Sequence, residues 1–193
     1  MGENKEKKFP SDFFKENPKV EHVLYKHKDN VALPIEDITT HSSANTAFIN
    51  EVKLESQYSL DNKPYIIAHN HTVDLEREHI NSFPSFDDFV TFLLNAKQET
   101  MAIYQHNGRT NQTEGMYVIK KTSKTSHLDW SEKLDNERKT LFGYQSTQQD
   151  SLSNEARQKL LNEVIEKFNL KIKYISAEGF CYVCGVGFLK KEK

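Results

Sequence analysis

The chain has little cysteine, no long apolar run and almost no net charge. No stretch approaches the roughly 20 apolar residues that cross a bilayer, and residues 1–5 lack the apolar core of a signal peptide. Gly2 is not followed by the Ser or Thr that a myristoylation signal requires. We therefore expect a cytoplasmic protein that does not associate with a membrane.

The small net charge argues against one class of partner. The formal charge is -2 and the sequence pI is about 6.5, whereas binding to a phosphate backbone depends on Lys and Arg. Nucleic acid is therefore expected only through a local basic patch.

The two cysteines, Cys181 and Cys184, form a single C-x-x-C within an alternating, strand-like segment. On a strand, positions i and i+3 point to opposite faces, and no second C-x-x-C completes a four-cysteine zinc site. The pattern favours buried structural cysteines over a redox or second zinc site.

A length of 193 residues with 12 Phe and 8 Tyr is enough for one domain with a substantial core. We expect an N-terminal tail over residues 1–18, a core domain over 19–120, a polar excursion over 121–150, and a C-terminal helix with two strands over 151–193.

Alternating and helical hydrophobic patterns predict the elements within these regions. Predicted strands cover residues 20–25, 31–34, 65–68, 101–104, 115–120, 171–176 and 180–189, and the first two of them form a hairpin. Predicted helices cover residues 86–97 and 153–168, the second capped by Ser153. Residues 42–60 suit a helix or an irregular connection equally well.

Three polar residues near the predicted strand 65–68 carry the chemistry. His69 and His71 follow that strand two residues apart, so the period of a strand points both imidazoles to one side. Asp88 lies in the first turn of the helix predicted from residue 86 and can face back toward the strand end. Two histidines and one aspartate make a three-ligand zinc site whose fourth position is open to water, as in catalytic zinc.

Hydrolysis of a peptide at such a site also needs a group that takes a proton from water and passes it to the leaving amine. Glu21 is the candidate for this acid–base role, with Glu36, Glu51 and Glu55 as alternatives. Ser85 would donate a hydrogen bond to the oxyanion of the tetrahedral intermediate.

Each of these residues also has a purely structural interpretation. Ser85 and Asp88, spaced i and i+3 after a proline, match a helix capping box. His69 and His71 could be strand-end histidines whose nitrogens bond the backbone, and Glu21 could be a surface carboxylate. The combination of all these residues in one order is more specific than any of its parts.

That order resembles the JAB/MPN (JAMM) metallopeptidase signature: Glu21, then Ile67-Ala68-His69-Asn70-His71, then Pro84-Ser85-x-x-Asp88. The likeness covers about residues 20–120 and is greatest to the bacterial and phage branch that includes RadC-like proteins. The resemblance implies an α/β (α+β) fold with a mixed sheet flanked by helices, a cytidine deaminase-like architecture. It also implies Zn²⁺ bound by His69, His71 and Asp88, Glu21 as general acid and base, and Ser85 at the oxyanion position.

Two features depart from the family pattern. Thr72 stands where the family has proline, and the spacing from Thr72 to Pro84 is longer than usual. The inserted residues 73–80 would cover the site, gate it or signal a changed substrate, and His79 within them could also reach the metal.

The leading hypothesis is therefore a zinc-dependent peptidase or isopeptidase whose partner is a protein or peptide substrate. One alternative is a non-catalytic JAB-like interaction or assembly protein of a phage or mobile element. A second is a RadC-like protein in nucleic-acid metabolism, which the charge does not favour. The sequence does not indicate the oligomeric state.

Overall fold

The computed structural model describes residues 10–29, 33–43, 46–73, 83–128 and 153–176. Along the chain the elements are α1 (Pro10–Glu16), β1 (Val23–His27), β2 (Glu36–Asp37), β3 (Thr39–Ser42), β4 (Ala47–Ile49), α2 (Glu51–Tyr58), β5 (Tyr65–Val73), α3 (Phe86–Leu94), β6 (Gln98–Asn107), β7 (Gln112–Lys120), α5 (Asn154–Lys167) and β8 (Lys171–Ser176). In these parts of the chain, no helix has the length and apolar character needed to cross a membrane.

A six-stranded mixed sheet forms the centre of the fold, with strand order β2-β1-β5-β6-β7-β8. β5 and β6 run parallel, and the other neighbours in this sheet run antiparallel. α3 lies in the connection from β5 to β6, as parallel strands require a crossover. β3 and β4 form a separate two-stranded sheet. The predicted mixed sheet flanked by helices is therefore confirmed.

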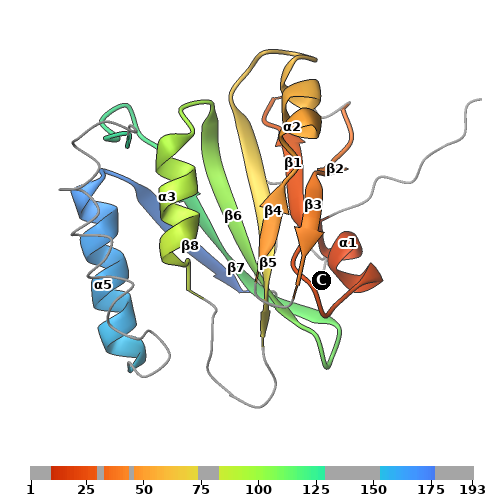
Figure 1. Ribbon diagram of the computed structural model, residues 1–193. Coiled ribbons are helices and arrows are strands. Elements are labelled where there is room, and N and C mark those ends of the chain that lie inside the picture. The colour runs from red at the N-terminus through yellow and green to blue at the C-terminus, as the bar shows by residue number, and fades with distance from the viewer. Residues whose placement is uncertain (1–9, 30–32, 44–45, 74–82, 129–152, 177–193) are drawn as a thin grey trace, which may run out of the picture.

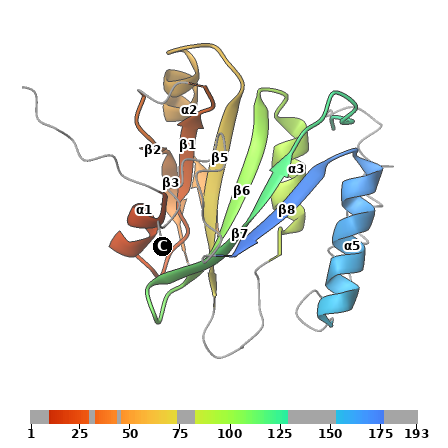
Figure 2. The ribbon, with the colours of Figure 1, turned by 180° about the vertical axis from the view of Figure 1, so that it is seen from behind.

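Helices cover both faces of the six-stranded sheet. α3 and α5 lie over one face (Figure 1), and α1 lies toward the other, which Figure 2 shows from behind. Side chains alternate between these faces along β5. Ile67 contributes to a buried cluster on the α3 face, whereas Ala68 packs in the cluster that contains Phe14 of α1.

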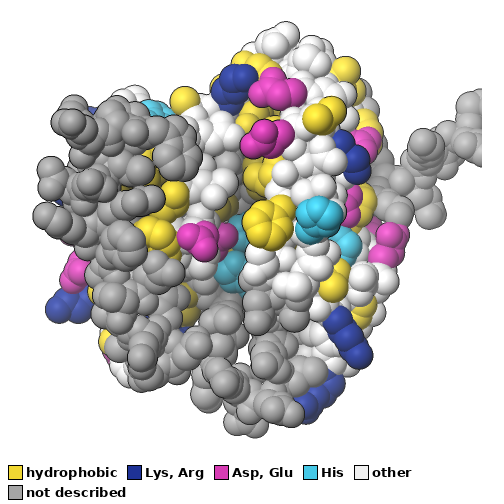
Figure 3. All heavy atoms as spheres, viewed as in Figure 1, with side chains coloured by type: hydrophobic (Ala, Val, Ile, Leu, Met, Phe, Trp, Pro, Cys, Tyr) yellow, Lys and Arg dark blue, Asp and Glu magenta, His cyan; other side chains and the backbone are white. Residues whose placement is uncertain are grey.

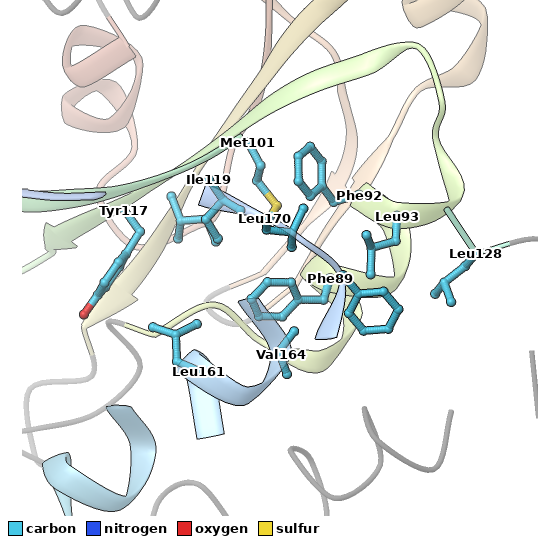
Figure 4. Close-up of a cluster of buried hydrophobic side chains, with 12 residues drawn as sticks. Phe89, Phe92, Leu93, Met101, Tyr117, Ile119, Leu128, Leu161, Val164 and Leu170 are labelled. Atoms are coloured by element: carbon cyan, nitrogen blue, oxygen red, sulfur yellow. The ribbon is translucent and has the colours of Figure 1, made fainter. Parts of the chain in front are cut away.

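The largest buried cluster lies between the sheet, α3 and α5 (Figure 4). α3 contributes Phe89, Phe92 and Leu93, whose i, i+3, i+4 spacing makes one apolar face. The remaining members come from β6, β7, α5 and the segments next to them: Met101, Ile103, Tyr117, Ile119, Leu128, Leu161, Val164, Phe168 and Leu170. This packing fixes α3 over the sheet and so determines where its N-terminus lies.

A smaller cluster joins β1 and β5 beneath α2 and the β3–β4 sheet. Its buried members are Val23, Tyr25, Ile38, Tyr65 and Ile67. It holds the start of β1 next to the middle of β5, with Val23 paired to His69.

Several predicted elements are confirmed with adjusted ends. The strand 171–176 is β8, and Ser153 caps α5 through its side chain. The helix predicted over 86–97 ends at Leu94. The strand predicted over 65–68 continues to Val73, because every residue of β5 pairs with β6. Residues 42–60, left open between helix and connection, contain the end of β3, β4 and α2.

Two expectations are corrected. β1 pairs with Glu36–Asp37. Of the predicted strand 31–34, residues 31 and 32 lie outside the described residues, and Leu33 and Pro34 are not in a strand; Pro34 has no N–H to donate to a ladder. Residues 10–16, within the region 1–18 that we expected to be a tail, form a helix whose Phe14 is 0 % exposed. Burying an apolar ring of this size against the sheet has a lower free energy than leaving it exposed to solvent.

Other predicted features lie outside the described residues. They are the strand 180–189 with Cys181 and Cys184, most of the insert with His79, and the polar excursion beyond residue 128.

The burial of Phe14 yields a stability prediction. Phe14→Ala should lower the free energy of unfolding by about 3–5 kcal/mol, because it leaves a cavity beside Tyr104, whose ring centroid is 5.0 Å away. Val52→Ala on α2, where Val52 is 81 % exposed, is the control and should change stability by less than about 0.5 kcal/mol. Urea denaturation measures both. Equal stabilities for the two variants would show that α1 does not belong to the core.

Candidate metal centre

Two histidines of β5 point to the same side of the sheet. His69 and His71 are separated by one residue, and both lie on the face that α3 covers. Their Nε2 atoms are 3.2 Å apart, and their ring centroids are 5.0 Å apart. Both side chains are about nine-tenths buried. The strand alone therefore brings two imidazole nitrogens to one point.

The N-terminus of α3 brings a carboxylate to the same point. Ser85 caps this helix, and its Oγ accepts a hydrogen bond from the backbone N–H of Asp88 at 3.1 Å. In return, the backbone N–H of Ser85 donates to Asp88 Oδ2 at 2.6 Å. This reciprocal capping box fixes the Asp88 side chain against its own helix. The capping interpretation of the Ser85 and Asp88 pattern is thus confirmed.

The cap does not exclude a second role for Asp88. Its Oδ1 lies 2.9 Å from His69 Nε2, and its Oδ2 lies 3.2 Å from His71 Nε2. The Asp88 carboxylate therefore takes part in the N-terminal cap of α3 and also contacts both histidines. The backbone N–H of Ser85 orients this carboxylate, as hydrogen bonds from surrounding residues orient metal ligands.

The number of available protons limits what these contacts can be. Each Nε2 carries at most one proton, and an ionised carboxylate carries none. The three close contacts among His69, His71 and Asp88 therefore share at most two protons, so all three cannot be hydrogen bonds at once. A cation at their centre would satisfy a lone pair from each residue.

The distances also suit a metal ion. One ligand atom from each of the three residues lies within 4.8 Å of the others. For zinc bonded at about 2.0–2.1 Å in tetrahedral geometry, ligand atoms are about 3.3 Å apart. The observed separations of 2.9–3.2 Å are close to that edge length. The residues present fit a divalent ion with nitrogen and oxygen ligands.

The electrostatics favour an ionised Asp88. Burial alone would raise the pKa of this carboxyl, but the charges of His69 and His71 and their hydrogen bonds together hold it well below its ordinary value. Asp88 is therefore a carboxylate, the form that binds metal.

Glu21 lies beside this cluster, 9 % exposed. Glu21 lies two residues before Val23, which pairs with His69 at the end of the β1–β5 ladder. Burial raises the pKa of Glu21, the charges of His71 and His69 lower it, and the charge of Asp88 raises it. The structure brings together Glu21, His69, His71 and Asp88 from three separate segments.

The alternative glutamates are placed differently. Glu51 and Glu55 are exposed on α2, and Glu55 lies 3.6 Å from the ammonium of Lys97. Glu36 lies on β2, where it pairs with Tyr25. The charges of His69 and His71 act on the carboxyl of Glu21, so Glu21 is the glutamate that we assign to the site.

Ser85 has its Oγ at the N-terminus of α3, next to the Asp88 carboxylate. Accepting one hydrogen bond leaves a hydroxyl its own proton to donate. The capping role is therefore compatible with donation to an oxyanion.

A cleft of about 730 Å³ lies on the same face of the sheet, toward α5. Gln105 pairs with His71 in the β5–β6 register and lines this cleft. The aromatic rings of Phe83, Tyr117 and Tyr174 form one wall, with centroids 5.7 and 5.0 Å apart along the row. Figure 3 shows histidine side chains in a hollow near the middle of the viewed face.

Sequence reasoning missed one residue of this region. Asn70 lies between the two histidines, points to the opposite face and is 0 % exposed. The available signal was a polar residue on the face of the strand that Ile66 and Ala68 share, because a buried amide requires hydrogen-bond partners.

No protein-family model, curated protein or solved structure matches the chain. The geometry of His69, His71, Asp88 and Glu21 is therefore what points to a metal centre.

The raised pKa of Glu21 predicts a pH-dependent cost in the metal-free protein. A folded-state pKa above the unfolded value gives stability that is present at acid pH and is lost as the pH rises through the folded pKa. Glutamine does not titrate, so Glu21→Gln should gain stability relative to wild type as the pH rises from about 4.5 to 7.

Urea denaturation in the presence of a chelator measures this difference. Glu163→Gln, which changes an exposed glutamate of α5, is the control and should show no such trend. A Glu21→Gln protein that is less stable than wild type at pH 7 and equal to it at pH 4.5 would contradict the burial of this carboxyl.

Proposed function

We propose that this protein is a zinc-dependent peptidase or isopeptidase of the JAB type, in which a glutamate activates water. The observation that carries the proposal is the convergence of His69, His71 and Asp88, with Glu21 buried beside them. Their order along the chain is that of the JAB/MPN signature, and the mixed sheet flanked by helices agrees with the architecture which that resemblance implies.

Zinc suits the donor set. Two imidazoles and one carboxylate are a common catalytic ligand set and leave a fourth position open. A metal binds the unprotonated form of an imidazole, and a divalent ion would offset the negative charge of Asp88, whose pKa is held low. A bound zinc ion supplies Lewis acidity, which polarises a carbonyl group and lowers the pKa of water toward neutrality.

Glu21 supplies the proton transfers. Its carboxylate removes a proton from water as the water oxygen bonds to the carbonyl carbon of the substrate. It then delivers that proton to the amine nitrogen as the carbon–nitrogen bond breaks, so the proton count balances. A pKa raised by burial suits both steps, because a catalytic group works best when its pKa lies near the working pH.

Ser85 assists at the carbonyl oxygen. Negative charge develops on this atom in the tetrahedral intermediate, and a preorganised hydroxyl donor stabilises it. The capping box holds the Ser85 side chain at the N-terminus of α3, whose positive dipole end favours the same charge.

A protein or peptide is the substrate class that this site suits. The cleft beside His71 offers an aromatic wall from Phe83, Tyr117 and Tyr174, and an amide from Gln105. Such a surface fits the side chains of an extended peptide. The net charge of -2 does not favour a nucleic-acid substrate, and we take the cytoplasm as the place where the protein acts.

A matched set of variants tests this function. Wild-type protein loaded with zinc should hydrolyse members of a pool of fluorogenic peptides and isopeptide-linked lysine substrates. Glu21→Gln should retain zinc but lose about 10²–10⁴-fold in kcat, because it removes the acid–base group and leaves the ligands. His69→Ala should lose both zinc and activity.

His41→Ala is the control for the histidine change, since His41 is exposed on β3; it should match wild type in both measurements. Zinc-loaded wild type that is as inactive as Glu21→Gln on every substrate would overturn the peptidase function and favour a JAB-like interaction protein.

A further inference from the structure

The buried amide of Asn70 contacts the main chain on both sides of Glu21. Its Oδ1 accepts a hydrogen bond from the backbone N–H of His22 at 2.7 Å. Its Nδ2 donates to the backbone carbonyl of Val20 at 3.1 Å. Two bonds of opposite sense thus hold the residue before Glu21 and the residue after it.

The location of these bonds follows from the end of a ladder. The paired registers of β1 and β5 run from His27 with Tyr65 to Val23 with His69. Beyond that pair, the side chain of Asn70 takes the place of a backbone partner. A side-chain amide offers both an acceptor and a donor, as a peptide group does, so it can continue the hydrogen bonding where the β1–β5 ladder ends.

A further bond holds the glutamate itself. The backbone N–H of Glu21 donates to the carbonyl of Ser43 at 2.8 Å. The carbonyl of Val20 and the N–H groups of Glu21 and His22 therefore all form hydrogen bonds to neighbouring segments. This fixes the direction in which the Glu21 side chain leaves the backbone.

Such fixing matters because Glu21 is buried at a cost. Glu21 is 9 % exposed, and holding an ionised carboxyl away from water costs free energy. An unrestrained segment would relieve that cost by turning the carboxylate out to water. Hydrogen bonds from a fully buried residue oppose this movement.

We propose that Asn70 is the positioning residue that holds Glu21 toward the centre formed by His69, His71 and Asp88. This inference rests on the function proposed above. It assigns two tasks to one strand: alternate residues of β5 supply the histidines on one face, and the residue between them places the acid–base group. The metal ligands and the glutamate are thereby held in a fixed relation although Glu21 and His69 are 48 positions apart in the sequence.

Cobalt provides a readout that does not depend on turnover. Co²⁺ replaces zinc in nitrogen and oxygen sites, and its visible bands respond to the groups around the metal. Asn70→Ala should bind one Co²⁺ per chain, because no ligand is removed, and its bands should shift in the same direction as those of Glu21→Gln. The double variant should match Glu21→Gln alone, because both changes remove the same interaction.

Two further measurements separate positioning from general destabilisation. In the metal-free protein, Asn70→Ala should speed hydrogen exchange of the Glu21 and His22 amides by about tenfold or more. On a substrate that the wild type cleaves, it should lower kcat by about 10–100-fold, as loss of an orienting partner does, with little change in KM.

Gln98→Ala is the matched control. Gln98 is a buried amide of β6 whose side chain donates to the carbonyl of Thr100. The Gln98→Ala protein should be less stable than wild type and should show unchanged cobalt bands. Asn70→Asp keeps the side-chain size and the acceptor for His22 but loses the donor to Val20, so it makes the same test if Asn70→Ala does not fold.

The outcomes distinguish the two proposals. Wild type that takes up no Co²⁺ would overturn the metal site and the role of Asn70 together. Uptake by all variants, with Asn70→Ala bands equal to those of wild type or with effects that add to those of Glu21→Gln, would overturn only the role of Asn70.

Discussion

The placement of Asp88 against His69 and His71 is the constraint on which the candidate site depends. It requires that β5 stay extended past its apolar half, so that both imidazoles share a face. It also requires that α3 begin at Ser85, so that its first turn returns to the end of β5. The cluster packed beneath α3 and the capping box meet the second requirement. The packing and the capping of α3 therefore also determine the geometry of the candidate metal ligands.

Burial gives this small polar cluster its chemical character. Burial alone would raise the pKa of Asp88, but the charges of His69 and His71 and their hydrogen bonds hold it low, whereas burial raises the pKa of Glu21. Two carboxyls in one site therefore have opposite tendencies: one suits a permanent ligand and the other suits proton transfer. Structural stability is reduced where a buried carboxyl is retained for such a task.

Local patterns predicted much of the fold and the central residues of the site. The period of two at His69 and His71 and the cap at Ser85 are short-range signals, and the structure confirms the geometry that each predicts. Long-range pairing was harder to predict. β1 was assigned a partner at 31–34 because that segment is adjacent and apolar, whereas the ladder forms with Glu36–Asp37. The burial of Phe14 depends on the far face of the sheet, which no local pattern describes. Asn70 was overlooked for the same reason, since its partners lie about 50 residues away.

The proposed metal centre consists of two imidazoles and a carboxylate at the end of β5. X-ray absorption at the zinc edge, on protein loaded with one equivalent of zinc, reports the atoms bound to the metal. We expect nitrogen and oxygen neighbours alone at about 2.0–2.1 Å, including outer-shell scattering from two imidazole rings. A sulfur neighbour at about 2.3 Å, or an unchanged spectrum in His71→Ala, would place the metal elsewhere in the chain and overturn the proposed centre.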